Sequence, residues 1–367
     1  MSDTHGFQSV GVPREIKSDE RRVALTPDGA SELHALGKTV LVEYDAGLGA
    51  GFANGDYEAA GAIIVDSAAD AWGAELVVKV KEPQDNEFTY LRSDLTLFTY
   101  LHLAAYPGVA TALCDAGTTG FAYETVTDDN GGLPLLAPMS EIAGQLAAQM
   151  GAHHLSAHLG GAGLLMGGVP GVLPAEVLVL GGGNVGWAAA RVALGLGANV
   201  TIVDRSIERL IWIDEHKFSR LRTLASSRAA VARAVASSDL VIGAVLVAGG
   251  RAPVVVSEDM VRTMRKGSVI VDVAVDQGGC VETTIETSHR EPTREVHGIV
   301  HYAVGNMPGA VPRTSTLALT NVTLPRIAEL AQKGTDHAIA SNSHLGNGLN
   351  TRNGEVVNAV VAQSISR

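Results

Sequence analysis

A glycine-rich segment is the clearest candidate for binding a phosphate-containing ligand. It reads Gly181-Gly182-Gly183-Asn184-Val185-Gly186 and directly follows an apolar run that ends at Leu180. In a G-x-G-x-x-G pattern the first glycine permits a tight turn, the second lets backbone approach a pyrophosphate, and the third lets a helix pack close to the strand. The N–H groups of that helix then face the anion. The segment predicts a dinucleotide site, and a glycine-rich βα turn that binds no ligand is the alternative.

An acidic residue lies where ribose recognition needs one. Asp204 ends the next predicted strand, about 20 residues after the glycines. Its carboxylate accepts hydrogen bonds from a free 2'-hydroxyl and repels a 2'-phosphate, whereas the adjacent Arg205 is able to hold that phosphate. Because Asp204 occupies the strand end, the sequence favours NAD over NADP, with Arg205 pointing into solvent.

Cations and one histidine occur where other strands are expected to end. Arg22 follows Arg21 in the loop after the first predicted strand, and an arginine there is able to clamp a carboxylate with two hydrogen bonds. Lys79 and Lys81 end another strand, where a period of two puts both on one face. His102 follows an apolar strand and is suited to proton exchange near neutral pH. The alternatives are solvated arginines and lysines and a packed histidine.

Acids and histidines form two weaker patterns. Asp276 follows an apolar run and precedes two glycines, so it either orients a base or a water or simply forms a turn. His154 and His158 are spaced i, i+4 on a predicted helix, but the third ligand and the glutamate of H-E-x-x-H are missing. We therefore predict no metal site. The sequence contains neither a P-loop nor a G-x-S-x-G motif.

Alternating strands and helices position these residues. Strands are predicted over residues 9–12, 39–43, 62–65, 75–80, 95–99 and 118–122, with helices over 27–36, 57–60 and 106–116. A helix over 141–155, with Ser140 as its N-cap, leads to a second set with strands over 176–180, 199–203, 240–243 and 268–273 and a helix over 185–196. A last helix is predicted over 324–332. Such βαβ alternation predicts two α/β units with parallel sheets.

Composition narrows the class of protein. The 367 residues include 27 basic and 39 acidic side chains, a net charge of -12 that argues against nucleic acid as a ligand. Two cysteines cannot form a disulfide framework and favour a reducing compartment. We expect a cytoplasmic protein, since the N-terminus does not resemble a signal peptide and the uncharged stretch 155–175 is interrupted by glycines, prolines and His158.

Taken together in chain order, these segments resemble the alanine dehydrogenase and transhydrogenase NAD-binding subunit family, and most closely its bacterial alanine dehydrogenases. The resemblance covers nearly the whole chain. It is carried by residues 11–27 (GVPREIKSDERRVALTP), 80–83 (VKEP), 101–104 (LHLA), 134–144 (PLLAPMSEIAG), 167–171 (GGVPG), 242–246 (IGAVL) and 276–279 (DQGG). The second glycine of the fingerprint, Gly182, replaces the alanine common in this family and is expected to loosen the turn slightly.

The resemblance implies an α/β fold of two Rossmann-like doubly wound domains, separated by a cleft and joined by long helices. Residues 1–135 and 306–367 would form the substrate domain and residues 136–305 the NAD-binding domain. It also implies oxidation of L-alanine with NAD and water to pyruvate, ammonium and NADH by a homohexamer without nucleic-acid or membrane partners. Two alternatives remain, the NAD-binding subunit of a transhydrogenase and a non-catalytic NAD sensor.

Residue roles follow from the same resemblance. Arg22 and Lys81 would bind the substrate carboxylate, His102 would be the acid and base, and Asp276 would support the water and amine steps. The remaining positions expected near the substrate are Met139, Asn306 and Met307. Those expected near NAD, besides the glycine motif, are Ser140, Asp204, Arg205, Ser226, Val245, Leu246 and Asn306.

Overall fold

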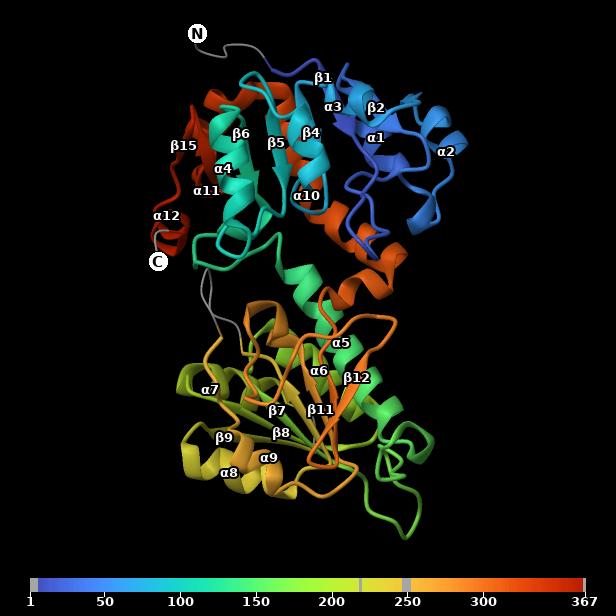
Figure 1. Ribbon diagram of the computed structural model, residues 1–367, viewed down its shortest axis with the longest axis vertical. Helices are drawn as coiled ribbons and strands as arrows, with labels where there is room; N and C mark the ends of the chain where they lie inside the picture. The colour runs from blue at the N-terminus through green and yellow to red at the C-terminus, as the bar shows by residue number, and fades with distance from the viewer. Residues whose placement is uncertain (1–5, 218–219, 246–251, 366–367) are drawn as a thin grey trace. The chain divides into compact units, whose positions relative to one another are not determined.

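The chain forms two compact units. The computed structural model (Figure 1) describes residues 6–217, 220–245 and 252–365, without the side chain of Asp276. Unit 1 comprises Met1–Met139 and Val311–Arg367, and unit 2 comprises Ser140–Ala310. Unit 1 is therefore built from both ends of the chain, whereas unit 2 is continuous.

Unit 1 is organised around a mostly parallel sheet. Its described strands have the order β15-β14-β6-β5-β4-β1-β2-β3. Their bounds are β1 Ser9–Val12, β2 Thr39–Glu43, β3 Ile63–Val65, β4 Leu76–Val78, β5 Thr96–Thr99, β6 Thr119–Ala122, β14 Leu349–Arg352 and β15 Glu355–Val356. Strands β1 to β6 pair in parallel, and β14 and β15 add in antiparallel fashion. The strand order reverses between β1 and β4, the point in open α/β sheets where ligands bind at the carboxyl edge.

Helices cover both faces of this sheet. They are α1 Pro27–Ala35, α2 Asn54–Ala59, α3 Ala68–Trp72, α4 Pro107–Asp115, α10 Pro312–Ser341, α11 Ser343–Asn347 and α12 Ala359–Ile365. Leu97 of β5 belongs to the apolar cluster that contains Leu113 of α4. The hydroxyl of the preceding Thr96 lies 3.3 Å from that of Thr335 in α10. Because successive strand residues face opposite sides, α4 and α10 lie on opposite faces, as Figure 1 also shows.

Unit 2 has a second sheet of the same kind. Its described strands have the order β12-β13-β11-β10-β7-β8-β9. Their bounds are β7 Glu176–Leu180, β8 Asn199–Asp204, β9 Leu221–Ala225, β10 Leu240–Gly243, β11 Val269–Asp272, β12 Thr293–Val296 and β13 Ile299–Tyr302. All pairs are parallel except that of β12 with β13. The order reverses between β7 and β10, so the glycine-rich turn after β7 lies at the switch point.

Short side chains let the helices of unit 2 pack tightly. The helices are α5 Ala137–His154, which begins at the end of unit 1, α6 Asn184–Gly195, α7 Ile207–His216, α8 Arg228–Ser237 and α9 Glu258–Arg262. Buried alanines line α6. A Cβ on Gly144 of α5 would lie 2.1 Å from the Val185 carbonyl oxygen, so only glycine permits this approach of α5 to α6. Among the described helices, none is both long and apolar enough to cross a membrane.

The predicted α/β class is confirmed, but several helices begin earlier than predicted, most clearly α2, α5 and α10. Helix α5 begins at Ala137, so Ser140 lies inside it and is not its N-cap. Pro138 stands in the first turn, where a missing N–H costs nothing, and this masks the true start. Helix α10 begins at Pro312, long before Leu324, because threonine-rich sequence hides its helical period. His154 ends α5 and His158 lies in the separate 3-10 turn Ala157–Leu159, so the two do not share a helix.

Candidate functional site

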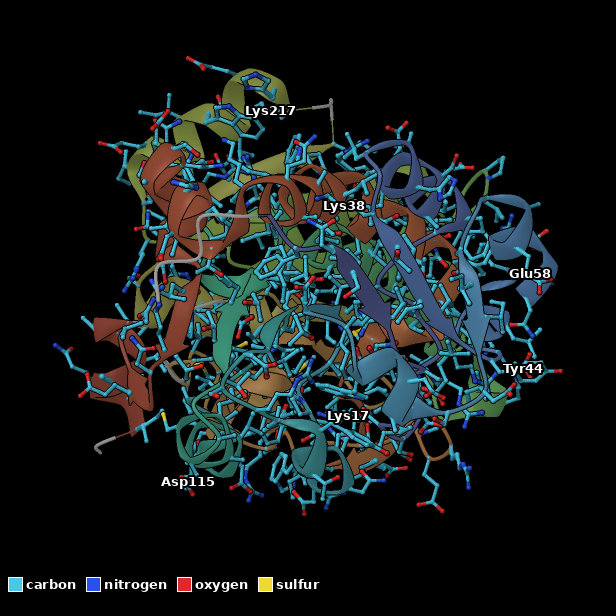
Figure 2. All side chains as sticks on the ribbon, turned by 90° about the horizontal axis from the view of Figure 1, so that it is seen from above. Lys17, Lys38, Tyr44, Glu58, Asp115 and Lys217 are labelled. Atoms are coloured by element: carbon cyan, nitrogen blue, oxygen red, sulfur yellow. The ribbon has the colours of Figure 1, made fainter. Side chains whose placement is uncertain are left out.

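The carboxyl edge of the unit 1 sheet gathers charged side chains from four loops. Lys17, Glu20 and Arg22 follow β1, Lys81 and Glu82 follow β4, His102 follows β5, and Glu124 follows β6. We call the first six of these the charged cluster. Lys17 is labelled in Figure 2, which also shows Tyr44 and Glu58 at the rim of the unit. Parallel strands bring these loops to one edge although they are far apart in sequence.

Arg22 is buried and paired. Its side chain is 2% exposed, its Nε donates to Glu20 Oε1 at 2.7 Å, and its second terminal nitrogen pairs with Glu20 Oε2. The remaining terminal nitrogen lies 3.1 Å from the sulfur of Met139. Burial raises the pKa of Glu20, but Arg22 outweighs it and lowers that pKa to about 2. The solvated alternative is therefore wrong for Arg22, whose guanidinium is held in one orientation by a carboxylate.

The two lysines after β4 lie in different surroundings. Strand β4 ends at Val78, so the period of two does not extend to them. Lys79 is fully buried between Glu15, at 3.2 Å, and Glu87, at 2.9 Å, which makes it part of the core. Lys81 instead interacts with the charged cluster, where burial and then Arg22 lower its pKa. Two cations held close together in this way favour an anion between or beside them.

His102 is fixed from several sides. Its backbone has φ 47°, in the left-handed region that few non-glycine residues adopt. Its N–H donates to Glu124 Oε1 at 2.6 Å, which holds that conformation. The imidazole stacks on Tyr100 with centroids 5.6 Å apart, and its Nδ1 lies 3.5 Å from Glu82 Oε2. The side chain remains 34% exposed, so the ring is supported on one side and reachable on the other.

Sequence reasoning missed the acidic members of the charged cluster. Glu20 and Glu82 lie close to Arg22 and Lys81 in the sequence, and neither was predicted to belong to the site. The signal was the alternation of charge in the run from Lys17 to Arg22 and the acid directly after Lys81. A buried cation is stable only with an anionic partner. A nearby carboxylate is therefore expected wherever a buried arginine or lysine is predicted.

The glycine-rich turn of unit 2 has the shape of an anion cradle. Gly181 has φ 96°, and a Cβ there would lie 2.5 Å from the Ala244 carbonyl oxygen. A Cβ on Gly186 would lie 1.8 Å from the Gly181 carbonyl oxygen, so the third glycine permits close packing of α6 on the turn. Gly183 is exposed, and a Cβ on it would meet no atom within 4 Å. Open space over backbone at a helix N-terminus fits a pyrophosphate.

Asp204 is oriented by this same turn. Its Oδ2 accepts from the Gly182 N–H at 2.7 Å and its Oδ1 from the Ser206 N–H at 2.8 Å. A carboxylate has about four lone-pair positions, so capacity remains for ribose hydroxyls. Arg205 is exposed. Arg209, which sequence reasoning missed, donates from Nε to the Gly182 carbonyl at 2.5 Å and stacks 4.0 Å from the centre of the Trp212 ring.

Other predicted cofactor positions also follow strand ends of unit 2. Ser226 comes directly after β9 and donates its N–H to the Asp204 carbonyl at 2.9 Å. Val245 follows β10 and is half-buried, whereas Leu246 lies outside the described residues. Asn306 has φ 54° and precedes the buried Met307. Ser140 is half-buried in α5.

The turn that contains Asp276 is built around another aspartate. Asp272 ends β11 and accepts from the N–H groups of Ala274, Cys280 and Val281 at 3.1, 2.9 and 3.1 Å. These bonds fold the 3-10 turn Val273–Gln277 at the carboxyl edge of the sheet. Asp276 belongs to this turn, and its side chain lies outside the described part of the chain. Of the residues the structure describes, no three His, Cys, Asp or Glu gather as potential metal ligands.

Comparisons with known proteins agree with both units. The N-terminal domain model described as "Alanine dehydrogenase/PNT" matches residues 11–143, and the corresponding C-terminal domain model matches residues 147–359. An alanine dehydrogenase of Bacillus subtilis is 55% identical over 97% of this chain and 94% of its own length. A solved L-alanine dehydrogenase superposes with a TM-score of 0.94 at 52% identity, covering 98% of this chain and 99% of the other. A transhydrogenase of Sinorhizobium meliloti follows at a TM-score of 0.82 and 26% identity, with coverages of 96% and 99%. The chain therefore belongs to the alanine dehydrogenase/PNT family.

Proposed function

We propose that this protein catalyses the NAD-dependent oxidative deamination of L-alanine. The balanced reaction converts L-alanine, NAD⁺ and water to pyruvate, ammonium, NADH and a proton, and it is reversible. The observation that carries the proposal is the charged cluster, in which Arg22, Lys81 and His102 meet at the carboxyl edge of the unit 1 sheet. Full-length relatives named alanine dehydrogenase support it.

Each member of the cluster has a task suited to its surroundings. Arg22, already oriented by Glu20, and Lys81 bind the carboxylate of alanine, and Lys81 also lies near the oxygen that forms at the α-carbon. His102 takes a proton from the attacking water and returns one to the departing amine, steps that require a group active near neutral pH. Asp276 supports these proton transfers. Met139 and Met307 would flank the substrate, and Asn306 is a further residue assigned to its binding.

We assign NAD to unit 2. When bound, NAD would supply the acceptor for a hydride from the α-carbon of alanine. The residues that would hold its pyrophosphate are Gly181, Gly183, Asn184, Val185 and Gly186, and Asp204 would accept hydrogen bonds from its ribose. Ser140, Arg205, Ser226, Val245, Leu246 and Asn306 complete the set around the cofactor. On this proposal the substrate domain is residues 1–135 with 306–367, the NAD-binding domain is 136–305, and the enzyme is a cytoplasmic homohexamer.

A second candidate is hydride transfer between two nucleotides. The match to a solved transhydrogenase favours it, since that protein shares the architecture at 26% identity. The two candidates differ in what the charged cluster of unit 1 binds, because only an amino-acid dehydrogenase needs it for a small carboxylate. A non-catalytic NAD sensor is the third possibility and needs no substrate at all.

NADH formation from L-alanine tests the proposal directly. We expect the purified chain to produce NADH with alanine and NAD, and to consume NADH with pyruvate and ammonium. His102→Ala and Asp276→Asn should each lower turnover roughly 100-fold or more, the scale of general acid-base catalysis. NADH affinity should persist in both, and the double variant should be little worse than the worse single one. Alanine-independent hydride exchange between nucleotides, or NAD binding without any turnover, would contradict the proposal.

A further inference from the structure

Two buried polar atoms of unit 1 face each other. Glu82 Oε2 and His102 Nδ1 lie 3.5 Å apart, and neither has a hydrogen-bond partner elsewhere among the described residues. This separation is the long limit of a hydrogen bond, and catalytic hydrogen bonds are often long until substrate binds. Buried polar groups are rarely left without a partner, so each of these two atoms is the natural partner of the other.

The carboxylate of Glu82 is fixed from its other side. Its Oε1 pairs with the ammonium of Lys17 and accepts from Gln84 Nε2 at 3.3 Å. Burial raises the pKa of Glu82, but hydrogen bonding with His102 and Lys17 lowers it to about 2. Glu82 is thus an anion with one oxygen committed to Lys17 and the other turned to the imidazole.

The imidazole is fixed independently of Glu82. Tyr100 stacks on one face, and the Tyr106 ring meets it edge-on with centroids 6.5 Å apart. Glu124 binds the backbone N–H groups of Leu101 and His102, at 3.1 and 2.6 Å. Among the described residues of unit 1, the charged and titratable groups around His102 include Glu82, Glu124, Lys17, Tyr100 and Tyr106.

We propose that Glu82 is a positioning residue that accepts a hydrogen bond from His102 Nδ1–H and so leaves Nε2 as the nitrogen that exchanges protons with substrate. The inference rests on the proposed function, in which His102 is the acid and base. Beyond that function, we infer that neutral His102 carries its proton on Nδ1 and that Glu82 selects this tautomer. Lys17 holds the Glu82 carboxylate in place. The arrangement has the logic of a carboxylate that orients a catalytic histidine.

The two neighbours of His102 act on it in opposite directions. The Glu82 carboxylate, 3.5 Å from Nδ1, favours the positive charge that the imidazole carries during proton transfer. Lys17 offsets part of that charge. Removing Glu82 and removing Lys17 should therefore displace the pH dependence of catalysis in opposite senses, which a purely structural role for either residue does not predict.

The first test measures the tautomer of His102 directly and does not depend on enzymatic activity. In protein with ¹⁵N-labelled histidine, the His102 signal is identified by its absence in His102→Gln. We expect neutral His102 to carry its proton on Nδ1 in the wild type and to become a mixture of tautomers in Glu82→Gln, with or without NADH. A wild-type ring protonated on Nε2, or a tautomer unaffected by Glu82→Gln, overturns the inference even if alanine is oxidised.

The second test uses pH profiles of kcat/KM for alanine. Glu82→Gln should lower kcat roughly 10- to 100-fold, the scale for carboxylates that orient histidines in metal sites, and move the acid-side inflection to lower pH. Lys17→Met keeps the alkyl stem and should move the inflection to higher pH. Glu82→Asp, which keeps the charge, should restore part of kcat, and Asp85→Asn, a nearby exposed carboxylate, should leave the profile unchanged.

The outcomes separate the two proposals. If the wild type oxidises alanine but Glu82→Gln and Lys17→Met, both folded by melting temperature, keep the wild-type inflection, the role of Glu82 is wrong and the function stands. If the tautomer responds to Glu82→Gln but no variant or wild type oxidises alanine, the function is wrong and the pairing stands. If Glu82→Gln does not fold, Lys17→Met and Glu82→Asp decide the question by the same measurements.

Discussion

The guanidinium of Arg22, proposed above to bind the substrate carboxylate, is held in one orientation by the protein itself. Nε and one terminal nitrogen of Arg22 both donate to the carboxylate of Glu20, and this double contact fixes the plane of the guanidinium. Lys81 is left beside it with a lowered pKa, because burial and then Arg22 disfavour its charge. A carboxylate bound beside Arg22 and Lys81 would relieve this repulsion, so part of the expected affinity for an anion arises from the arrangement of the charged cluster.

Arg22→Lys should behave as a severe substitution. Lysine keeps the charge but loses the planar fork that pairs with Glu20 and with a substrate carboxylate. We expect KM for alanine and for pyruvate to rise roughly tenfold or more, with NADH affinity near that of the wild type. Unchanged Michaelis constants would exclude Arg22 from the substrate site. Arg21→Lys, at the exposed neighbouring position, is the matched control.

Asp204 should set the choice between the two cofactors. We expect specificity for NAD over NADP of at least about tenfold, or roughly 1.4 kcal/mol, because the carboxylate faces the added phosphate. Asp204→Asn keeps an oxygen for the Gly182 N–H and should narrow the preference. If Arg205 binds the 2'-phosphate in that variant, adding Arg205→Ala should return its catalytic efficiency with NADP toward the wild-type value. Equal efficiency of the wild type with both cofactors would contradict this assignment.

At the scale of elements, the sequence predicted the bounds of several strands better than the ends of helices, but it missed β9 and β12 to β15. Apolar runs bounded by glycine or charge identified β1, β2, β7 and β10 with their observed bounds. The start of α10 was missed because β-branched threonines carry no helical signal of their own and become helical only through burial against the sheet, as Thr316 and Thr323 are. The glycine turn and Asp204 were predictable because local spacing determines them. Glu82 was not, since its contacts with Lys17 and His102 join separate loops. Glu20 pairs with Arg22 inside one loop, and the alternation of charge there was its only local signal.

The βα turn after β7 offers a matched pair of substitutions. Gly186→Ala places a Cβ 1.8 Å from a carbonyl oxygen, so it should destabilise the fold by about 1–3 kcal/mol or more. Gly183→Ala meets no protein atom within 4 Å and should leave the melting temperature unchanged while weakening NADH binding, because its methyl group occupies the space for pyrophosphate. Thermal melts and NADH titrations of both variants check this. Full NADH affinity in Gly183→Ala would show that the cofactor lies elsewhere.

At the scale of the whole molecule, buried carboxylates link stability to pH. The pKa of Glu20 and that of Glu82 are each lowered from 4.5 to about 2. A lowered pKa stabilises the folded state above the unfolded value, and this contribution is lost as pH falls from about 4.5 toward about 2. Acid should therefore lower the free energy of unfolding of unit 1, because Glu20 and Glu82 in the loops of the charged cluster become protonated.

Glu20→Gln makes this dependence measurable. The difference in unfolding free energy between wild type and variant should be largest at pH 7 and smaller by about 2 kcal/mol at pH 3, one and a half pH units below 4.5. Chemical denaturation at both pH values gives the two differences. Glu58→Gln, at an exposed carboxylate, should show a small difference that does not change with pH. If the difference in unfolding free energy between the wild type and Glu20→Gln were the same at both pH values, the proposed dependence of stability on the Glu20 pKa would be wrong.

The discontinuity of unit 1 has a consequence for the newly synthesised chain. Unit 2 is continuous and becomes complete once Ala310 has left the ribosome, whereas β6 of unit 1 pairs with β14, whose Leu349 lies opposite Phe121. At roughly 5–20 residues per second, the 57 residues from Val311 to Arg367 take about 3–11 s to translate. During that time the first 139 residues present an open strand edge and an uncovered sheet face. We therefore expect ribosome-associated chaperones to bind nascent chains at this stage. We also expect the speed of translation over residues 311–367 to affect the yield of native protein.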